Sequence, residues 1–216
     1  MIDHFTIGVP MKTTMNLINL SLMLITLSFA TQFAGAQSVV MTNQEPKVTH
    51  VVIMNTNHGA VTLSLYGEDA PKTVDNFVGL AEQNFYDGIL FHRVVPGFVI
   101  QAGDPKTKDE ALKSQWGTGG ESIYGGDFVD ELNANTKSYQ IGYAKGVLAM
   151  ANRGPNTNTS QFFICLEDLG LPKNYTMYGK VTEGMDIVAK IAAVPLNGST
   201  PKDPVIITSM KVKKKH

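Results

Sequence analysis

The sequence predicts a mainly β fold, a closed antiparallel barrel of eight strands with two α-helices over its ends. Short apolar runs bounded by turn residues recur along most of the chain, whereas only two segments in that part have helical spacing. No internal repeat and no low-complexity linker interrupts this pattern. Many short strands with turn signals between them are typical of small barrels whose interior is filled by side chains.

The strands follow from runs of β-branched, aromatic and other apolar residues. The first two flank Asn57-His58-Gly59, a turn sequence that predicts a hairpin. Pro96-Gly97 predicts a turn between the third and fourth strands. We expect strands over residues 51–56, 61–66, 89–95, 98–102, 147–151, 162–166, 177–181 and 205–212.

Two segments have the period of a helix instead. Residues 70–82 carry a proline at the second position, and their apolar residues recur three and four positions apart. A second stripe is formed by Met185, Val188 and the pair Ile191/Ala192. The long connections 105–143 and 152–160 are rich in Gly, Asn, Thr and Ser, and loops of such length usually carry function.

The first 36 residues have the pattern of a secretory signal peptide. A basic start at Met11-Lys12 precedes an apolar stretch over residues 17–30, and a small-residue site ends at Ala36. The stretch is shorter than the roughly 20 apolar residues of a membrane span. We expect cleavage after Ala36 and location in the periplasm. Release from the cell and anchoring by an uncleaved signal remain alternatives, as do Met1 and Met11 for the start.

The rest of the chain is expected to hold one domain over residues 48–212, between a flexible lead-in at 37–47 and a basic tail at 213–216. Cys165 is the single cysteine, so no disulfide can form within the chain. The formal net charge of −1 gives no electrostatic case for binding nucleic acid. We expect a monomer with no membrane span after processing.

Common catalytic templates do not fit. His50, His58 and His92 show no metal-ligand spacing with each other or with Cys165. Ser160 is not in a nucleophile elbow. The glycines of residues 117–120 lack the lysine of a phosphate-binding loop. We therefore expect no metal and no cofactor. His92 is expected to be a structural histidine with its hydrogen bonds satisfied, on the strand face opposite Arg93.

The segment 91–104 places a guanidinium, a phenyl ring and a carboxamide close together, at Arg93, Phe98 and Gln101. Strand alternation puts Phe98 and Ile100 on one face and Val99 with Gln101 on the other. From these residues alone, the segment is either the wall of a binding pocket or an arginine covering the edge of the core.

Residues 91–104, 116–125 and 150–164 together resemble the cyclophilin family of peptidyl-prolyl cis-trans isomerases, in an exported bacterial form. The resemblance covers roughly residues 48–212 and implies the eight-stranded cyclophilin barrel. It implies rotation of X-Pro bonds in proline-containing unfolded or flexible polypeptides, and assistance to the folding of exported proteins. The resemblance assigns a catalytic set of Arg93, Phe98 and Gln101, and a substrate-binding set of Val99, Ala151, Asn152, Gln161, Phe163, Leu171 and Tyr175.

The chain departs from the family pattern at several positions. Val99 stands where methionine is common, and Tyr175 where many members have histidine. The loop 168–175 lacks the tryptophan that helps to bind cyclosporin, with Leu169 or Gly170 at that position, so we expect weak cyclosporin binding. The loop 105–116 is longer than in compact members. A non-catalytic peptide-binding or chaperone module that uses the same groove is the main alternative function, and a small-ligand barrel is a weaker one.

Overall fold

The computed structural model describes residues 45–214. The predicted signal peptide and its cleavage site lie outside these residues, as does most of the predicted lead-in. No helix of residues 45–214 is long and apolar enough to cross a membrane. The first described residues pair with the domain through Glu45–Lys180 at 3.2 Å and Lys47–Glu68 at 2.5 Å.

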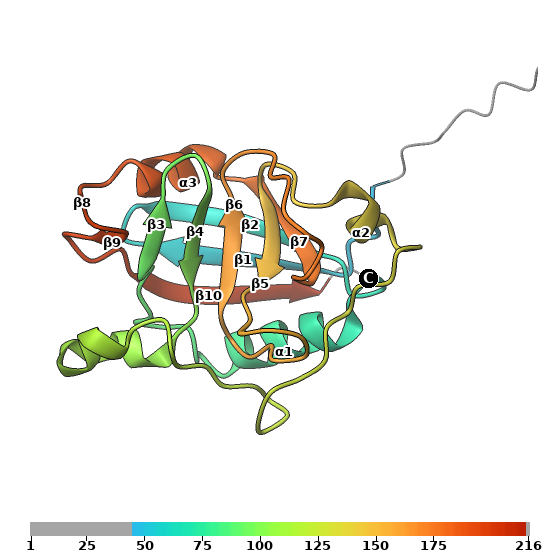
Figure 1. Cartoon of the computed structure of the whole chain (residues 1–216), viewed down its shortest axis with the longest axis horizontal. Helices are drawn as coiled ribbons and strands as arrows, with labels where there is room; N and C mark the ends of the chain where they lie inside the picture. Colours follow the sequence, from blue (N-terminus) through green and yellow to red (C-terminus); the bar gives the residue numbers. More distant parts are fainter. Residues whose placement is uncertain (1–44, 215–216) are drawn as a thin grey trace, which may run out of the picture. The chain divides into compact units, whose positions relative to one another are not determined.

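Eight strands form one antiparallel sheet (Figure 1). Its order is β10-β1-β2-β7-β5-β6-β4-β3. The hairpin predicted at Asn57-His58-Gly59 is confirmed, because β1 and β2 pair from His50–Leu65 to Thr56–Gly59. The strands are β1 (His50–Thr56), β2 (Gly59–Leu65), β3 (Arg93–Val95), β4 (Val99–Ala102), β5 (Val147–Met150), β6 (Phe162–Cys165), β7 (Met177–Glu183) and β10 (Ile207–Lys214).

The sheet is a half-barrel that stays open, so the prediction of a closed barrel is wrong in this respect. Its edge strands β3 and β10 do not pair, although the segments before them are joined by an isolated bridge, Leu90–Ile206, and by backbone hydrogen bonds such as Phe91 N–H to Val205 O at 2.9 Å. The outer edge of β3 meets a two-stranded ribbon, β8 (Leu196–Asn197) with β9 (Thr200–Pro201), and the Val94 N–H donates to Ser199 O at 2.7 Å. The ribbon therefore occupies the edge that closure would need.

The two predicted helices are present as α1 (Pro71–Glu82) and α3 (Met185–Ala192). Figure 1 shows them at opposite ends of β3–β6. A third, short helix α2 (Lys137–Ile141) was not predicted, because five residues carry no periodic stripe. Two 3-10 helices, η1 (Pro105–Lys108) and η2 (Glu110–Gln115), occupy the long loop after β4. Strand β10 runs through Lys214, two residues into the segment predicted as a tail.

The main core lies between the inner face of the sheet and α1. Phe77 of α1 is fully buried and contacts three aromatic rings, with centroid distances of 5.1 Å to Tyr86 and 5.5 Å to both Phe162 and Tyr178. The apolar stripe predicted for residues 70–82 therefore closes one end of the half-barrel.

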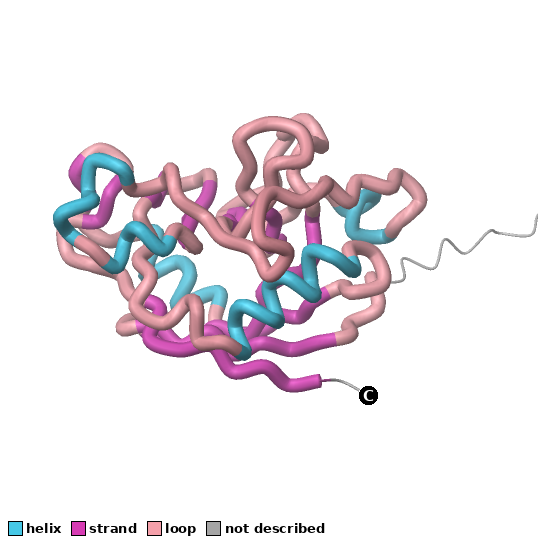
Figure 2. The backbone as a smooth tube through the Cα atoms, turned by 90° about the horizontal axis from the view of Figure 1, so that it is seen from below, coloured by secondary structure: helices cyan, strands magenta, loops and turns pink. Residues whose placement is uncertain are grey.

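Figure 2 shows the loops gathered on the side of the domain away from β10.

A second apolar cluster lies on the outer face of β4, β6 and β5. Strand β6 is buried on both faces, because Phe162 and Ile164 face the main core while Phe163 and Cys165 belong to this second cluster. Val99 and Ala149 join Phe163 in it. This outer cluster is the floor on which the candidate site is built.

Candidate active site

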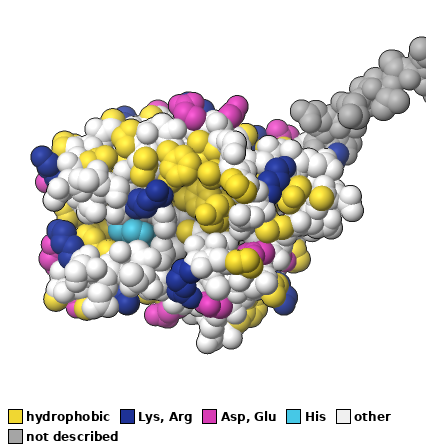
Figure 3. Space-filling view, viewed as in Figure 1, with side chains coloured by type: hydrophobic (Ala, Val, Ile, Leu, Met, Phe, Trp, Pro, Cys, Tyr) yellow, Lys and Arg dark blue, Asp and Glu magenta, His cyan; other side chains and the backbone are white. Residues whose placement is uncertain are grey.

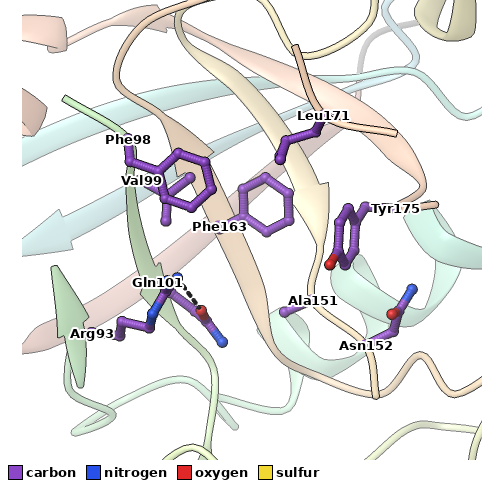
Figure 4. A pocket seen from close by; sticks show the side chains of 9 residues that line it. All are labelled: Arg93, Phe98, Val99, Gln101, Ala151, Asn152, Phe163, Leu171 and Tyr175. Carbon is purple, nitrogen blue, oxygen red and sulfur yellow. Dashed lines mark hydrogen bonds between the residues drawn. The ribbon is translucent and has the colours of Figure 1, made fainter. Parts of the chain in front are cut away.

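A cavity of about 280 Å³ opens over the outer face of β4 and β6 (Figure 4). On this face Figure 3 shows a hollowed apolar patch with a basic side chain at its edge. Nine of the ten residues assigned by the family resemblance line the cavity together. They are Arg93, Phe98, Val99, Gln101, Ala151, Asn152, Phe163, Leu171 and Tyr175.

Strand register brings the central side chains into one row. Arg93 of β3 is paired with Gln101 of β4, and Gln101 is paired with Phe163 of β6. Directly opposed residues on neighbouring strands point to the same side and lie within contact distance. Val99 shares this face, two residues before Gln101 along β4. The row therefore runs from a cation through an amide to an aromatic ring.

Phe98 joins this face although strand alternation predicted the opposite one. The residue precedes β4 and lies in the turn, where its N–H donates to Val95 O at 2.9 Å. Strand alternation does not apply to a residue in a turn, and the Phe98 ring lines the cavity beside Val99 (Figure 4). The Arg93 guanidinium carbon lies 5.8 Å from the centre of the Phe98 ring, within cation–π range.

The predicted tenth residue, Gln161, lies behind the cavity instead of lining it. Its Oε1 accepts a hydrogen bond from Gln101 Nε2 at 3.0 Å, and Gln101 Oε1 accepts one from Arg93 Nη1 at 3.3 Å. Gln161 lines a smaller neighbouring hollow of about 50 Å³ that shares Gln101, Ala151 and Asn152 with the cavity. Gln161 therefore contacts the site through Gln101 and does not line the cavity itself.

The far wall of the cavity is a loop held in place by Asn152 and Tyr143. Asn152 Nδ2 donates to Asn174 O at 2.9 Å. The Tyr143 hydroxyl accepts from the Tyr175 N–H at 2.9 Å and donates to Tyr175 O at 3.1 Å. Sequence reasoning did not find Tyr143, because it lies outside the three motifs. An aromatic residue at the end of a glycine-containing connection was the only signal.

The floor of the cavity offers no nucleophile. Cys165 is fully buried beneath it, and burial raises the pKa of the thiol to about 12. A thiol with such a pKa carries almost no thiolate at neutral pH. Within residues 45–214, no group of three His, Cys, Asp or Glu side chains is arranged to hold a metal ion. The site offers an apolar pocket and fixed hydrogen-bond donors.

His92 is buried beside the site, but its predicted hydrogen bonds are missing. The residue is only 7% exposed, and neither ring nitrogen has a hydrogen-bond partner among residues 45–214. Burial lowers the pKa of His92 below its ordinary value, although the nearby Asp104 charge opposes the shift. The folded protein therefore favours the neutral imidazole.

We expect His92 to make stability depend on pH. Below about pH 6.5 the unfolded chain takes up a proton at this position that the folded chain resists, so stability falls as pH falls. His92→Phe should give a shallower decline in melting temperature between about pH 7.5 and 5.5. Thermal unfolding of both proteins across this range measures the difference, and parallel curves would contradict the assignment.

Comparison with known families agrees with this geometry. A family model described as Cyclophilin type peptidyl-prolyl cis-trans isomerase/CLD matches residues 51–212. The chain belongs to the cyclophilin-type peptidyl-prolyl cis-trans isomerases. The expectation of a peptidyl-prolyl cis-trans isomerase is thereby confirmed, and the open, mainly β architecture is the cyclophilin fold.

Proteins named as peptidyl-prolyl cis-trans isomerases in several organisms are similar to this chain. Peptidyl-prolyl cis-trans isomerase-like 1 of Aspergillus fumigatus is 41% identical over 163 residues, which cover 74% of this chain and 94% of that protein. Peptidyl-prolyl cis-trans isomerase ppi1 of Schizosaccharomyces pombe is 41% identical, covering 72% and 94%. A crystal structure of a cyclophilin from Cryptosporidium parvum superposes with a TM-score of 0.68 at 33% identity, covering 79% of this chain and 100% of that one. A second structure of that protein was obtained in the presence of the dipeptide Ala-Pro.

Proposed function

We propose that the nine-residue cavity binds the prolyl residue of a flexible polypeptide and that Arg93 catalyses rotation about the preceding peptide bond. Phe98, Val99, Phe163 and Leu171 supply an apolar socket for the ring. Gln101 holds Arg93 at its rim and offers an amide to the substrate backbone. Proline-containing polypeptides are then the substrates. The observation that carries the proposal is a guanidinium fixed at the edge of a cavity whose floor is apolar.

The reaction needs no covalent step. Rotation about the X-Pro bond is slow because the nitrogen lone pair is delocalised into the carbonyl, which gives a barrier of roughly 18–20 kcal/mol. In the twisted transition state the lone pair returns to nitrogen, where a hydrogen-bond donor stabilises it. Arginine suits this role because it stays protonated and presents several donors in a fixed plane.

The required stabilisation is within reach of such a site. Uncatalysed isomerisation takes about 10–100 s. Lowering the barrier by about 7 kcal/mol would shorten ~100 s to about a millisecond, at 1.36 kcal/mol per tenfold. A donor that acts on the transition state more than on the ground state, in a site shielded from water, supplies energy of this kind. Comparing the cis-to-trans conversion of a proline peptide by wild type and Arg93→Ala tests the mechanism.

We further propose that the protein is an exported bacterial form that assists folding of other exported proteins, with the periplasm as its location. The support is the basic start, apolar stretch and small-residue site over residues 11–36. The mature protein from cells should begin at Gln37, which N-terminal sequencing of the exported fraction would establish. A purified cellular protein that still carries Met1 or Met11 would contradict processing.

We also propose that the protein binds cyclosporin only weakly, because the loop 168–175 contains no tryptophan. The only tryptophan in the sequence, Trp116, lines a different hollow, together with Lys113 and Pro204. A Cβ atom at Gly170 would meet no other atom within 4 Å, so a side chain can begin there without a clash. Because burying an aromatic side chain contributes at least about 1.4 kcal/mol, which is tenfold in affinity, we expect Gly170→Trp to bind cyclosporin at least about tenfold more tightly. Titration calorimetry on both proteins, with Gly170→Ala as control, checks this, and equal affinities would contradict it.

A further inference from the structure

The glycine-rich segment 117–120 folds around a buried carboxylate. Asp104 is fully buried just after β4, and its side chain accepts three backbone N–H groups. These come from Lys106 at 2.8 Å, Gly117 at 2.6 Å and Gly119 at 3.0 Å. A carboxylate buried in this way is stabilised by the donors that surround it, and it holds those donors in place.

Glycine is required at two positions of this loop. A Cβ atom at Gly119 would lie 2.2 Å from Asp104 Oδ1, and Gly117 has a φ of +90°. Other residues would clash at the first position and be strained at the second. The glycines, which fit no nucleotide-binding motif, therefore allow the backbone to approach Asp104 closely.

The same loop presents two carbonyl groups to Gln161. Gln161 Nε2 donates to Gly117 O at 3.0 Å and to Gly119 O at 2.6 Å. The side chain is only 7% exposed, so water offers it few alternative partners. Because backbone carbonyls only accept, the loop fixes which end of the Gln161 amide carries the nitrogen.

This orientation passes to Arg93 through Gln101. Because the Gln161 amide nitrogen faces the loop, its Oε1 faces Gln101. Gln101 therefore has to donate to this oxygen from its own Nε2. Gln101 Oε1 then faces Arg93 Nη1. Arginine can only donate, so both ends of the chain require the same amide orientation. No other orientation of the two glutamines satisfies all four of these hydrogen bonds.

We propose that Asp104, the loop 117–119 and Gln161 form a hydrogen-bond relay that positions the Arg93 guanidinium for catalysis. Asp104 and Gln161 are positioning residues, since they act on the substrate through Gln101 and Arg93. Without the relay, the Gln101 amide could reverse and set its NH₂ against the guanidinium, which would release Arg93 from its place. This inference rests on the proposed role of Arg93.

The test uses Gln161→Glu, which keeps the shape of the side chain and changes only the donor. When ionised, the introduced carboxylate cannot donate to Gly117 O and Gly119 O, whereas its protonated form has a single O–H to give. Burial against two carbonyls raises the pKa of the introduced carboxyl above its ordinary value of about 4.3. The charged or titratable groups that border the relay are Arg93, His92, Asp104, Lys106 and Arg153.

The ratio of kcat/KM between Gln161→Glu and wild type is measured from about pH 8 to pH 5 with a proline tetrapeptide. We expect a ratio of about one tenth at high pH, rising severalfold as pH falls and the carboxyl regains its proton. Taking the ratio removes any titration that the two proteins share. A ratio near one throughout, or a loss that does not change with pH, would overturn the relay.

Asp104→Asn tests the relay from its other end and decides the matter if Gln161→Glu does not fold. This change sets an NH₂ group against at least one of the three backbone donors, so we expect kcat to fall severalfold with KM nearly unchanged. The melting temperature of each relay variant shows whether it folds. In every relay variant that folds, the ¹H–¹⁵N signal of the Arg93 guanidinium should also shift from its wild-type position. Wild-type kcat and an unmoved signal in Asp104→Asn would overturn the proposal.

Ser122→Ala is the matched control in the segment that follows the loop. Its hydroxyl contacts Gly126 O and the backbone N–H groups of Tyr124 and Gly126, none of which belongs to the relay. We expect wild-type kinetics and an unmoved Arg93 signal. The outcomes separate the two proposals, because an active Arg93→Ala variant would refute the proposed mechanism itself. An inactive Arg93→Ala with unaffected relay variants would refute the relay alone.

Discussion

Arg93→Ala should lower kcat/KM for a proline peptide by about 10²–10³, the usual cost of removing one donor that acts on a transition state. The structure gives the reason. The guanidinium is held at the rim of the cavity by Gln101 at 3.3 Å and lies over the Phe98 ring. Alanine removes the donor and leaves the apolar socket of Phe163 and Val99 in place. Coupled or NMR-detected isomerisation of a cis-enriched peptide measures the loss.

Lys113→Ala is the control for this experiment. It also removes one positive charge, but Lys113 is an exposed residue of η2, paired with Glu110 at 2.7 Å. Its activity should equal that of wild type. A similar loss in both variants would show that net charge matters and that the position of Arg93 does not.

Phe77→Ala should have the largest effect on stability, lowering the free energy of unfolding by about 3–5 kcal/mol. Its ring is fully buried where α1 meets the sheet, in contact with Tyr86, Phe162 and Tyr178. Deleting it removes apolar burial and leaves a cavity that these rings cannot fill without moving. Since domains of this kind are stable by about 5–15 kcal/mol, the loss is a large fraction of the total.

Urea denaturation followed by circular dichroism measures this loss. Ile141→Ala, which truncates an apolar residue that is 40% exposed, should change the free energy of unfolding by no more than about 0.5 kcal/mol. If Phe77→Ala cost no more than this control, α1 would not be closing the core in the way the structure shows.

Much of the fold could be predicted because most strands have local signals. The hairpin at residues 57–59 and the proline-led helix α1 depend on neighbouring residues alone. Closure of the barrel could not be predicted in this way, since it depends on which segment reaches the edge of β3. That segment is the short ribbon β8–β9, and its two-residue strands have no alternating pattern to detect.

The site, like the fold, could be predicted from the sequence only in part. Residue types and order within residues 91–104 indicated a pocket, and the family resemblance selected its members. The segment itself could not separate a pocket from the edge of the core, because its residue Val99 is 2% exposed and packs like a core residue. Strand alternation predicted the wrong face for Phe98, because this residue lies in a turn. Asp104 and the loop 117–120 gave no catalytic signal, because their effect on Arg93 passes through two glutamines.

The most direct test of the account measures binding and catalysis on one peptide with one variant. Exchange NMR on a proline peptide gives both the dissociation constant and the catalysed isomerisation rate for wild type and Arg93→Ala. We predict that Arg93→Ala binds within a few-fold of wild type while its isomerisation rate falls by about 10²–10³, because the socket remains and the donor is gone. An unchanged isomerisation rate at equal binding would contradict the assignment of Arg93 as the catalytic group.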